Sequence, residues 1–152
     1  MDIPEVGRFA IIRDPQGAVI SAFTPQGEAR VPEGAFVWDE LHTSDLEAAK
    51  QFYTKVFGWT INEMDMGEHG TYVLFQAGGV DRAGATSQMP NDPSPPHWLT
   101  YVGTDDVDAT TAKAKELGGT IYMDPMDIPN IGRFSIAADP TGAAFGIYKP
   151  AS

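Results

Sequence analysis

The sequence predicts an α+β fold in which two βαβββ units follow an extra N-terminal β-hairpin, and three observations support this. Residues 3–25 match residues 128–150 without gaps, with 11 identities in 23 positions. A weaker repeat, at an offset near 61, relates residues 44–48 to residues 105–109. Each of those two segments carries the start signals of a helix. A repeated pattern of this kind points to repeated supersecondary units.

The stronger repeat predicts a hairpin at each end of the chain. Both copies contain an apolar strand, an Asp-Pro-x-Gly turn and a second apolar strand. We expect an orphan hairpin over residues 1–27, which repeats residues 128–150, and one complete domain over residues 34–150. Because the orphan strands have no partner of their own, we expect a homodimer. In it the hairpin either pairs with an open strand edge or swaps with the C-terminal hairpin.

The first unit, residues 34–89, contains a well-signalled helix. Ser44 is the expected N-cap, and Glu47 completes a capping box. Gly58 ends the helix. The apolar residues of this helix recur at helical spacing and form one face, which consists of Leu46, Ala49, Phe52, Tyr53, Val56 and Phe57. The expected strands of this unit are 36–43, 60–64, 71–76 and 82–88.

The second unit, residues 97–150, repeats this order after a proline-rich linker at residues 90–96. Its helix is expected from about Asp106 to Leu117, started by Thr104 or Asp105 and stopped by Gly118. The expected strands of this unit are 98–104, 120–123, 133–138 and 143–149.

Composition excludes several functional classes. The 152 residues carry 21 Asp and Glu against 10 Lys and Arg, a net charge of −11, so nucleic acids and acidic membranes are not expected partners. The absence of cysteine excludes disulfides, thiolate metal sites and a cysteine nucleophile. The sequence has neither a membrane-spanning apolar run nor a secretory signal, so the cytoplasm is the default expectation.

Five short motifs stand out along the chain. They are Trp38-x-Glu40-Leu41-x-Thr43-x-Asp45-Leu46, Phe57-Gly58-Trp59, Pro96-His97-Trp98, Asp105-Asp106-Val107-Asp108-Ala109 and Asp139-Pro140-x-Gly142. Together they resemble the vicinal oxygen chelate superfamily of glyoxalase, bleomycin-resistance and extradiol dioxygenase proteins. The resemblance extends to its glyoxalase-like tandem-module subfamily, which includes a two-module mycobacterial antigen. It implies paired βαβββ units whose sheets curl around a cleft.

The resemblance also implies a metal that chelates two substrate oxygens, but the residues at its ligand positions do not suit one. These positions fall on Trp38, Leu99 and Gly146, none of which offers a metal donor. The fourth ligand strand offers Thr86, Ser87 and Gln88, which have no imidazole or carboxylate. We therefore expect no metal cofactor at the usual place. An alternative is a displaced divalent metal held by Glu40, His42 and His97.

Aromatic side chains take the place of metal ligands in the expected cleft. Alternation along the strands places four aromatic residues on the face toward the cleft, namely Trp38, Tyr101, Tyr148 and Tyr72. Such a lining suits a flat small molecule. The alternative is that these side chains pack in the core. Glu40 is the best candidate for a polar anchor or general base, because an inward carboxylate is costly unless it is paired or solvated. His42 and His97 come next.

These observations favour a small-molecule binding protein without the family's metal. The alternative is a lyase or isomerase that uses Glu40 as its base, with or without a displaced metal. A third reading is a regulatory fragment whose hairpin drives association. The residues expected to bind the ligand are Trp38, Glu40, His42, Tyr72, His97, Leu99, Tyr101, Gly146 and Tyr148.

Overall fold

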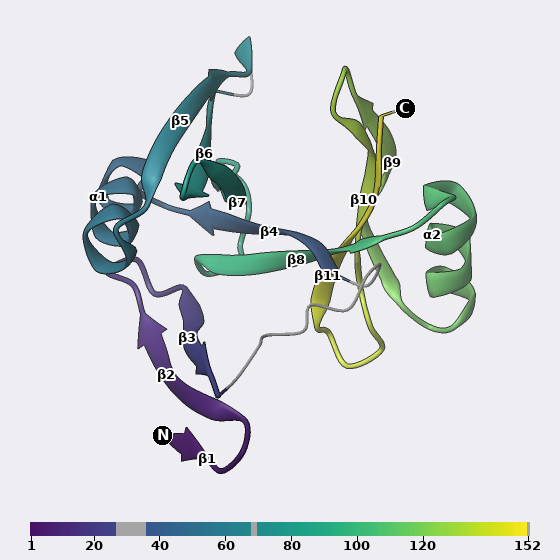
Figure 1. Ribbon diagram of the computed structural model, residues 1–152. Helices are drawn as coiled ribbons and strands as arrows, with labels where there is room; N and C mark the ends of the chain where they lie inside the picture. The colour runs from purple at the N-terminus through teal and green to yellow at the C-terminus, as the bar shows by residue number, and fades with distance from the viewer. Residues whose placement is uncertain (27–35, 68–69, 152) are drawn as a thin grey trace. The chain divides into compact units, whose positions relative to one another are not determined.

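The computed structural model describes residues 1–26, 36–67 and 70–151, and the chain divides into two compact units (Figure 1). The first unit contains residues 1–32 and 40–98, and the second contains residues 33–39 and 99–152. The predicted α+β class and both βαβββ repeats are confirmed. No helix in the described ranges has the length and apolar character needed to cross a membrane.

The N-terminal hairpin is present as predicted. It forms a three-stranded antiparallel sheet in the order β1-β2-β3. The strands are β1 (Asp2–Ile3), β2 (Gly7–Arg13) and β3 (Val19–Pro25). In the turn between β2 and β3, Oδ1 of Asp14 accepts hydrogen bonds from the backbone N–H groups of residues 16, 17 and 18. This is the role expected of an Asp that opens a tight turn.

The rest of the first unit is a mixed sheet with one helix. The order β5-β6-β7-β4 is antiparallel up to β7, and β7 then pairs in parallel with β4. Its elements are β4 (Phe36–Thr43), α1 (Leu46–Phe57), β5 (Thr60–Asp65), β6 (Thr71–Ala77) and β7 (Val80–Ser87). The first four residues of β4 belong to the second unit.

The second unit repeats this plan in the order β8-β11-β10-β9. Strand β11 pairs in parallel with β8, and β10 pairs antiparallel with β11 and β9. The elements are β8 (His97–Gly103), α2 (Val107–Glu116), β9 (Thr120–Ile128), β10 (Gly132–Ala138) and β11 (Ala144–Pro150). Strand β9 continues five residues beyond the predicted end, because register shifts let it stay paired with β10 as far as Ile128.

The N-cap of each helix lies later than predicted, by one residue in α1 and by one or two residues in α2. Asp45, not Ser44, is the N-cap of α1, and its Oδ1 accepts from the N–H of Ala48 at 2.9 Å. Asp106, not Thr104 or Asp105, is the N-cap of α2, with the same bond from Ala109 at 2.9 Å. The residue two before each cap is a threonine whose hydroxyl accepts from the cap's own N–H, so the threonine shapes the entry and the aspartate caps the helix.

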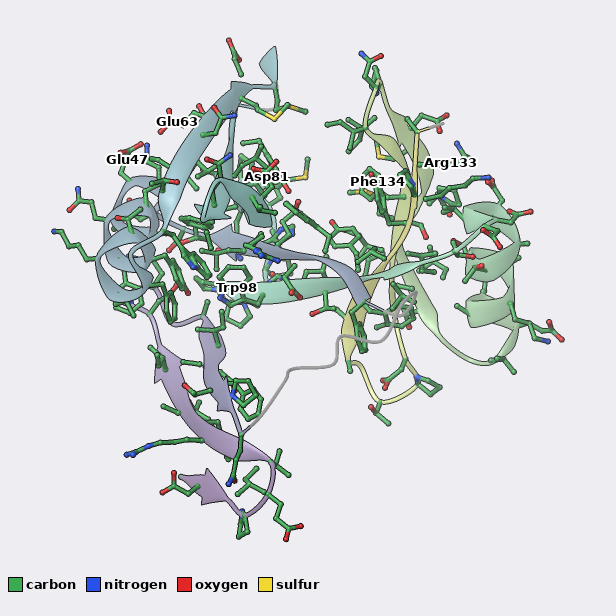
Figure 2. All side chains as sticks on the ribbon, viewed as in Figure 1. Glu47, Glu63, Asp81, Trp98, Arg133 and Phe134 are labelled. Carbon is green, nitrogen blue, oxygen red and sulfur yellow. The ribbon has the colours of Figure 1, made fainter. Side chains whose placement is uncertain are left out.

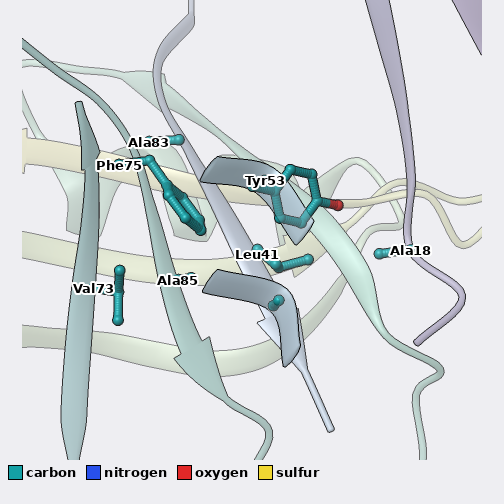
Figure 3. Close-up of a cluster of buried hydrophobic side chains, with 8 residues drawn as sticks. Ala18, Leu41, Tyr53, Val73, Phe75, Ala83 and Ala85 are labelled. Atoms are coloured by element: carbon teal, nitrogen blue, oxygen red, sulfur yellow. The ribbon is translucent and has the colours of Figure 1, made fainter. Parts of the chain in front are cut away.

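The core of the first unit forms around Tyr53, which is fully buried (Figure 3). Phe52, Trp59 and Trp98 pack against this core, while Val56 on the predicted apolar face is exposed. The buried members of this cluster are Ala18, Leu41, Ala49, Tyr53, Val73, Phe75, Ala83 and Ala85. Ala18 comes from the N-terminal hairpin, which therefore contributes to this core.

A buried hydrogen-bond chain joins the hairpin to the same core. Nε1 of Trp98 donates to the hydroxyl of Tyr53 at 3.0 Å, and that hydroxyl donates to Oδ2 of Asp14 at 2.9 Å. Burial, together with the neighbouring Asp14 carboxylate, raises the pKa of Tyr53. The Tyr53 phenol is therefore a neutral donor. The indole N–H of Trp98, the Tyr53 hydroxyl and Oδ2 of Asp14 are all hydrogen-bonded to one another in this series.

In the second unit a hydrogen bond between Ser135 of β10 and Thr111 of α2 joins the strand to the helix. Their buried hydroxyls lie 2.6 Å apart. Phe145 packs against the small core of Val107, Ala137 and Ile147. Arg133, labelled in Figure 2, donates two hydrogen bonds to Asp108 at 2.7 and 2.8 Å and one to Asp127 at 3.0 Å. These bonds join β10 to the first turn of α2 and to β9.

Candidate functional site

The first unit places the carboxylate of Glu40 between a tyrosine and a histidine. The hydroxyl of Tyr72 donates to Oε2 of Glu40 at 2.6 Å. Nε2 of His42 lies 2.9 Å from Oε1 of the same carboxylate. The side chains of Glu40 and His42 are only 13% and 17% exposed, respectively. We call Glu40, His42, Tyr72 and His97 the Glu40 cluster.

A glycine makes the contact between Tyr72 and Glu40 possible. Tyr72 is on β6 and Glu40 is on β4, and strand β7 lies between them. Glu40 pairs with Gly84 of β7. A Cβ at position 84 would lie 1.9 Å from the Tyr72 hydroxyl oxygen. The phenol therefore crosses β7 over Gly84, because only glycine leaves that space open.

His42 is in ion-pair reach of Glu40, but Nε2 is not aligned with Oε1 for a hydrogen bond. This ring nitrogen is buried. The carboxylate and the imidazole therefore lie close together without a hydrogen bond between Nε2 and Oε1.

His97 stacks on His42, with ring centroids 5.0 Å apart and planes 10° from parallel. Nδ1 of His97 lies 2.9 Å from the backbone carbonyl of Pro95. A carbonyl only accepts, so Nδ1 carries the proton of a neutral His97 ring, and Nε2 is left as the acceptor. The expectation that Glu40 and both histidines lie near one another agrees with these contacts.

The loop before β8 adds a second carboxylate near the histidines. Oδ1 of Asp92 accepts from the hydroxyl and the N–H of Ser94 at 2.7 and 2.9 Å. These bonds, with smaller contributions from His97 and His42, lower the pKa of Asp92. Gln88 anchors the same loop by donating to the Ser94 carbonyl at 2.8 Å. Sequence reasoning missed Asp92, for which the Asp-x-Ser spacing was the available signal.

A displaced metal does not fit the Glu40 cluster. Among residues 1–26, 36–67 and 70–151, no group of three or more His, Asp or Glu side chains is arranged to hold a metal ion. Ring nitrogens bind metals through lone pairs in the plane of the ring. The stacked, nearly parallel rings of His42 and His97 therefore do not direct their lone pairs at one ion.

The second unit contains an aromatic cluster of Tyr101, Phe134 and Tyr148. Tyr101 lies with its ring centroid 6.4 Å from each of the other two. The Tyr148 hydroxyl donates to the carbonyl of Ile131 at 2.8 Å, and burial raises the pKa of this tyrosine. Phe134, labelled in Figure 2, was not among the predicted site residues, although it lies directly opposite Tyr148 on the neighbouring strand and so on the same face of the sheet.

The positions that the resemblance gives for metal ligands do not suit a metal in the structure either. A Cβ at Gly146 would lie 2.1 Å from the ring of Tyr101, so this space is already filled. Leu99 is buried and its side chain has no donor. Trp38 is half-buried and offers an indole. The residues at these positions therefore do not fit a metal.

The nine predicted binding residues divide between the two units. Glu40, His42, Tyr72 and His97 belong to the first unit and form the Glu40 cluster. The other five belong to the second unit, and they are Trp38, Leu99, Tyr101, Gly146 and Tyr148. The carboxylate and both imidazoles thus belong to one unit, and three of the four aromatic side chains belong to the other.

Comparison with known proteins identifies relatives of this architecture. Residues 36–147 match the Glyoxalase/Bleomycin resistance protein/Dioxygenase superfamily. The protein named "Putative glyoxylase CFP32" from Mycobacterium bovis is 38% identical over 99% of this chain and 59% of its own length. The Anthracycline biosynthesis protein DnrV from Streptomyces peucetius is 33% identical over 79% of this chain and 48% of its own length. The chain thus spans only about half to three-fifths of these relatives.

Solved structures share the fold at low sequence identity. Methylmalonyl-CoA epimerase from Mycobacterium tuberculosis has a TM-score of 0.58 and 15% identity, with 81% of this chain and 94% of that chain covered. The hypothetical protein BH1468 from Bacillus halodurans has a TM-score of 0.60 and 10% identity, with 80% and 97% covered. At these identities the likeness concerns the vicinal oxygen chelate fold alone.

Proposed function

Because the chain belongs to the Glyoxalase/Bleomycin resistance protein/Dioxygenase superfamily, we propose that it binds a small carbonyl compound at the Glu40 cluster and moves a proton on it. The proposed enzyme is a lyase or isomerase that works without a metal at the family's usual site. The observation that carries this proposal is the position of Glu40, whose two carboxylate oxygens contact Tyr72 and His42 at 2.6 and 2.9 Å.

The contacts suggest how the roles divide. Since Oε2 of Glu40 already accepts from Tyr72, this carboxylate acts best through its neighbour His42. A carboxylate beside an imidazole stabilises the imidazolium that forms when the ring takes a proton. His42 is then the group that takes the proton, and Glu40 and Tyr72 orient it. The expected role of Glu40 as the base becomes a role shared with His42.

The proposed step balances without any further reactant. His42 removes the proton from the carbon next to a carbonyl, and the C–H electron pair moves into that carbonyl to give an enolate. The imidazolium of His42 exchanges its proton with solvent and then gives a proton back to the enolate, which restores neutral His42. Return to the opposite face of the same carbon is an epimerisation. In a 2-hydroxy carbonyl compound, return to the former carbonyl carbon is an isomerisation, in which the hydroxyl proton passes to the enolate oxygen and the hydroxyl carbon becomes the new carbonyl. The epimerase among the structural neighbours and the glyoxylase name of the relative agree with this reaction class.

Exchange of hydrogen for deuterium provides the test. The protein, treated with a chelator, is incubated in D2O with the hemithioacetal of methylglyoxal and glutathione or with methylmalonyl-CoA. Proton NMR then follows the C–H signal next to the carbonyl. We expect catalysed exchange, which His42→Gln and Glu40→Gln slow by about 100-fold or more. Glu47→Gln, at an exposed glutamate of α1, is the matched control and leaves the rate unchanged.

A second candidate is binding without turnover, and the aromatic cluster of the second unit favours it. Tyr101, Phe134 and Tyr148 present ring faces and edges of the kind that hold flat molecules. The anthracycline name of one relative agrees with a flat ligand. Thermal stabilisation by a planar polycyclic ligand, lost in Tyr148→Ala and unaffected by His42→Gln, together with no C–H exchange, would favour this candidate over the enzyme.

A further inference from the structure

The outer edge of β3 offers an unpaired row of backbone groups. In the described residues, β3 pairs only with β2. The backbone bonds Gln26 N–H to Val6 O and Asp14 N–H to Ala18 O flank this ladder. Because bonded pairs alternate in an antiparallel ladder, the even-numbered residues of β3 face β2. The N–H and C=O groups of Val19, Ser21 and Phe23 therefore point outward.

The internal repeat indicates what such an edge accepts. The offset of 125 aligns residues 21–23 of β3 with residues 146–148 of β11. In the second unit, those β11 residues pair with residues 101–103 of β8, and Tyr148 accepts a further bond from Thr104 at 2.9 Å. Strand β11, which repeats the sequence of β3, thus pairs in parallel with β8 along the edge that corresponds to the open edge of β3.

The open edge of β3 lacks the charged residues and internal prolines that usually prevent edge strands from pairing. The sequence of β3, VISAFTP, contains no charged residue, and its proline stands at the last position. The exposed face of the hairpin carries three apolar side chains, since Ile11, Val19 and Phe23 are 69%, 47% and 52% exposed. Ser21 and Arg13 are exposed on the same face. Residues 1–25 carry three acidic and two basic side chains, a net charge of −1, whereas the whole chain carries −11. The hairpin thus carries little of the negative charge of the chain, so the repulsion between two hairpins is weak.

We propose that β3 pairs antiparallel with β3 of a second copy of this chain, across a two-fold axis. Such a pairing is isologous, because the same edge supplies donors and acceptors to both sides. It joins the two hairpins into one continuous sheet and brings the Phe23 side chains to the same face. The absence of an N–H on Pro25 ends the row of bonds on each side.

Sedimentation over a range of protein concentrations tests the pairing. We expect a reversible dimer, and we expect Ser21→Lys to weaken it about tenfold or more, because two like charges then meet near the axis. Val80→Lys adds the same charge at another exposed apolar position and leaves the dimer unchanged. A monomer at every concentration, or a dimer that Ser21→Lys leaves intact, would overturn the proposal.

Cross-linking gives a second test that does not weaken the interface. The chain has no cysteine, so a single introduced thiol reports only on its own neighbours. We expect Ser21→Cys to form an oxidised dimer about tenfold faster than Ile11→Cys. Both positions are on the exposed face, but Ile11 lies one strand farther from the axis, on β2. Equal or reversed rates would refute the pairing, whatever the activity of the protein.

Discussion

Glu40 and Tyr101 occupy the same place in the two βαβββ repeats. Each lies on the first strand of its repeat and pairs in parallel with a glycine of the last strand, Gly84 for Glu40 and Gly146 for Tyr101. In both units an aromatic ring fills the space that this glycine leaves, from Tyr72 in one and from Tyr101 itself in the other. The repeat thus preserves the backbone plan while one unit has a carboxylate where the other has a phenol.

Adding one methyl group at Gly84 should disturb the Glu40 cluster. A Cβ there would lie 1.9 Å from the Tyr72 hydroxyl, so the ring must move and its bond to Glu40 must break. We expect Gly84→Ala to lower the free energy of unfolding by about 1–3 kcal/mol. Urea unfolding measures this loss, and in a Tyr72→Ala background it should largely disappear. An equal loss in both backgrounds would contradict the steric explanation.

Returning a carboxylate to position 146 should not restore a metal site. The ring of Tyr101 fills the space, with its nearest atom 2.1 Å from where the Cβ would be. We expect Gly146→Glu to lower the melting temperature and to leave zinc binding, followed by isothermal titration calorimetry, no stronger than in the parent protein. Zinc binding gained by this variant would show that the aromatic ring yields to the ion.

Removing the hydroxyl of Tyr53 should loosen the N-terminal hairpin. Tyr53→Phe leaves Nε1 of Trp98 and Oδ2 of Asp14 without their shared partner. We expect a loss of about 1–3 kcal/mol in the free energy of unfolding. Amide hydrogen exchange should also rise in β2 and β3. Tyr122→Phe, at an exposed tyrosine of β9, is the matched control and should change neither measurement.

Asp92 should contribute to the acid dependence of stability. Bonds from Ser94 lower its pKa below the ordinary 3.8, so folding is favoured by its ionised form. This contribution is fully present above the ordinary pKa and is lost as the pH falls through the lowered one. Unfolding experiments between about pH 5 and pH 2 should therefore show a shallower acid slope for Asp92→Asn than for the parent. Ser94→Ala should shift the slope in the same direction.

Substitution at the start of α2 distinguishes its cap from its neighbour. The carboxylate of Asp106 accepts from Ala109, whereas the predicted cap Asp105 is outside the helix. We expect Asp106→Ala to cost about 1 kcal/mol in the free energy of unfolding, and Asp105→Ala to cost much less. Equal costs for the two variants, measured by thermal unfolding, would argue against the assigned cap.

Much of the fold was predictable because local signals decide it. The Asp-Pro-x-Gly turns and the glycine after α1 identified the hairpin and the end of the helix from the sequence alone. The cap of α1 was predicted one residue early, since Ser44 and Asp45 are both good caps and only the backbone conformation separates them. Alternation along β4 predicts that Glu40 and His42 share one face, and their side chains lie 2.9 Å apart.

The details of the candidate site were less predictable because they depend on contacts between distant segments. Nothing in the local sequence around Tyr72 shows that its ring crosses a neighbouring strand over Gly84. The stacking of His42 on His97 joins residues 55 positions apart, and strand parity alone does not give a ring angle. Asp92 was missed because its role depends on how a proline-rich loop folds back.

The contact between Asp14 and Tyr53 bears on where this domain begins. The matched family region, residues 36–147, omits the hairpin that supplies Asp14 and Ala18. A fragment cut to that region would leave the phenol of Tyr53 without its acceptor and would uncover the apolar surface beneath Ala18. Truncation at the family boundary would therefore give a less stable protein that aggregates through its exposed apolar surface. The first 26 residues should be kept in any preparation intended to remain folded.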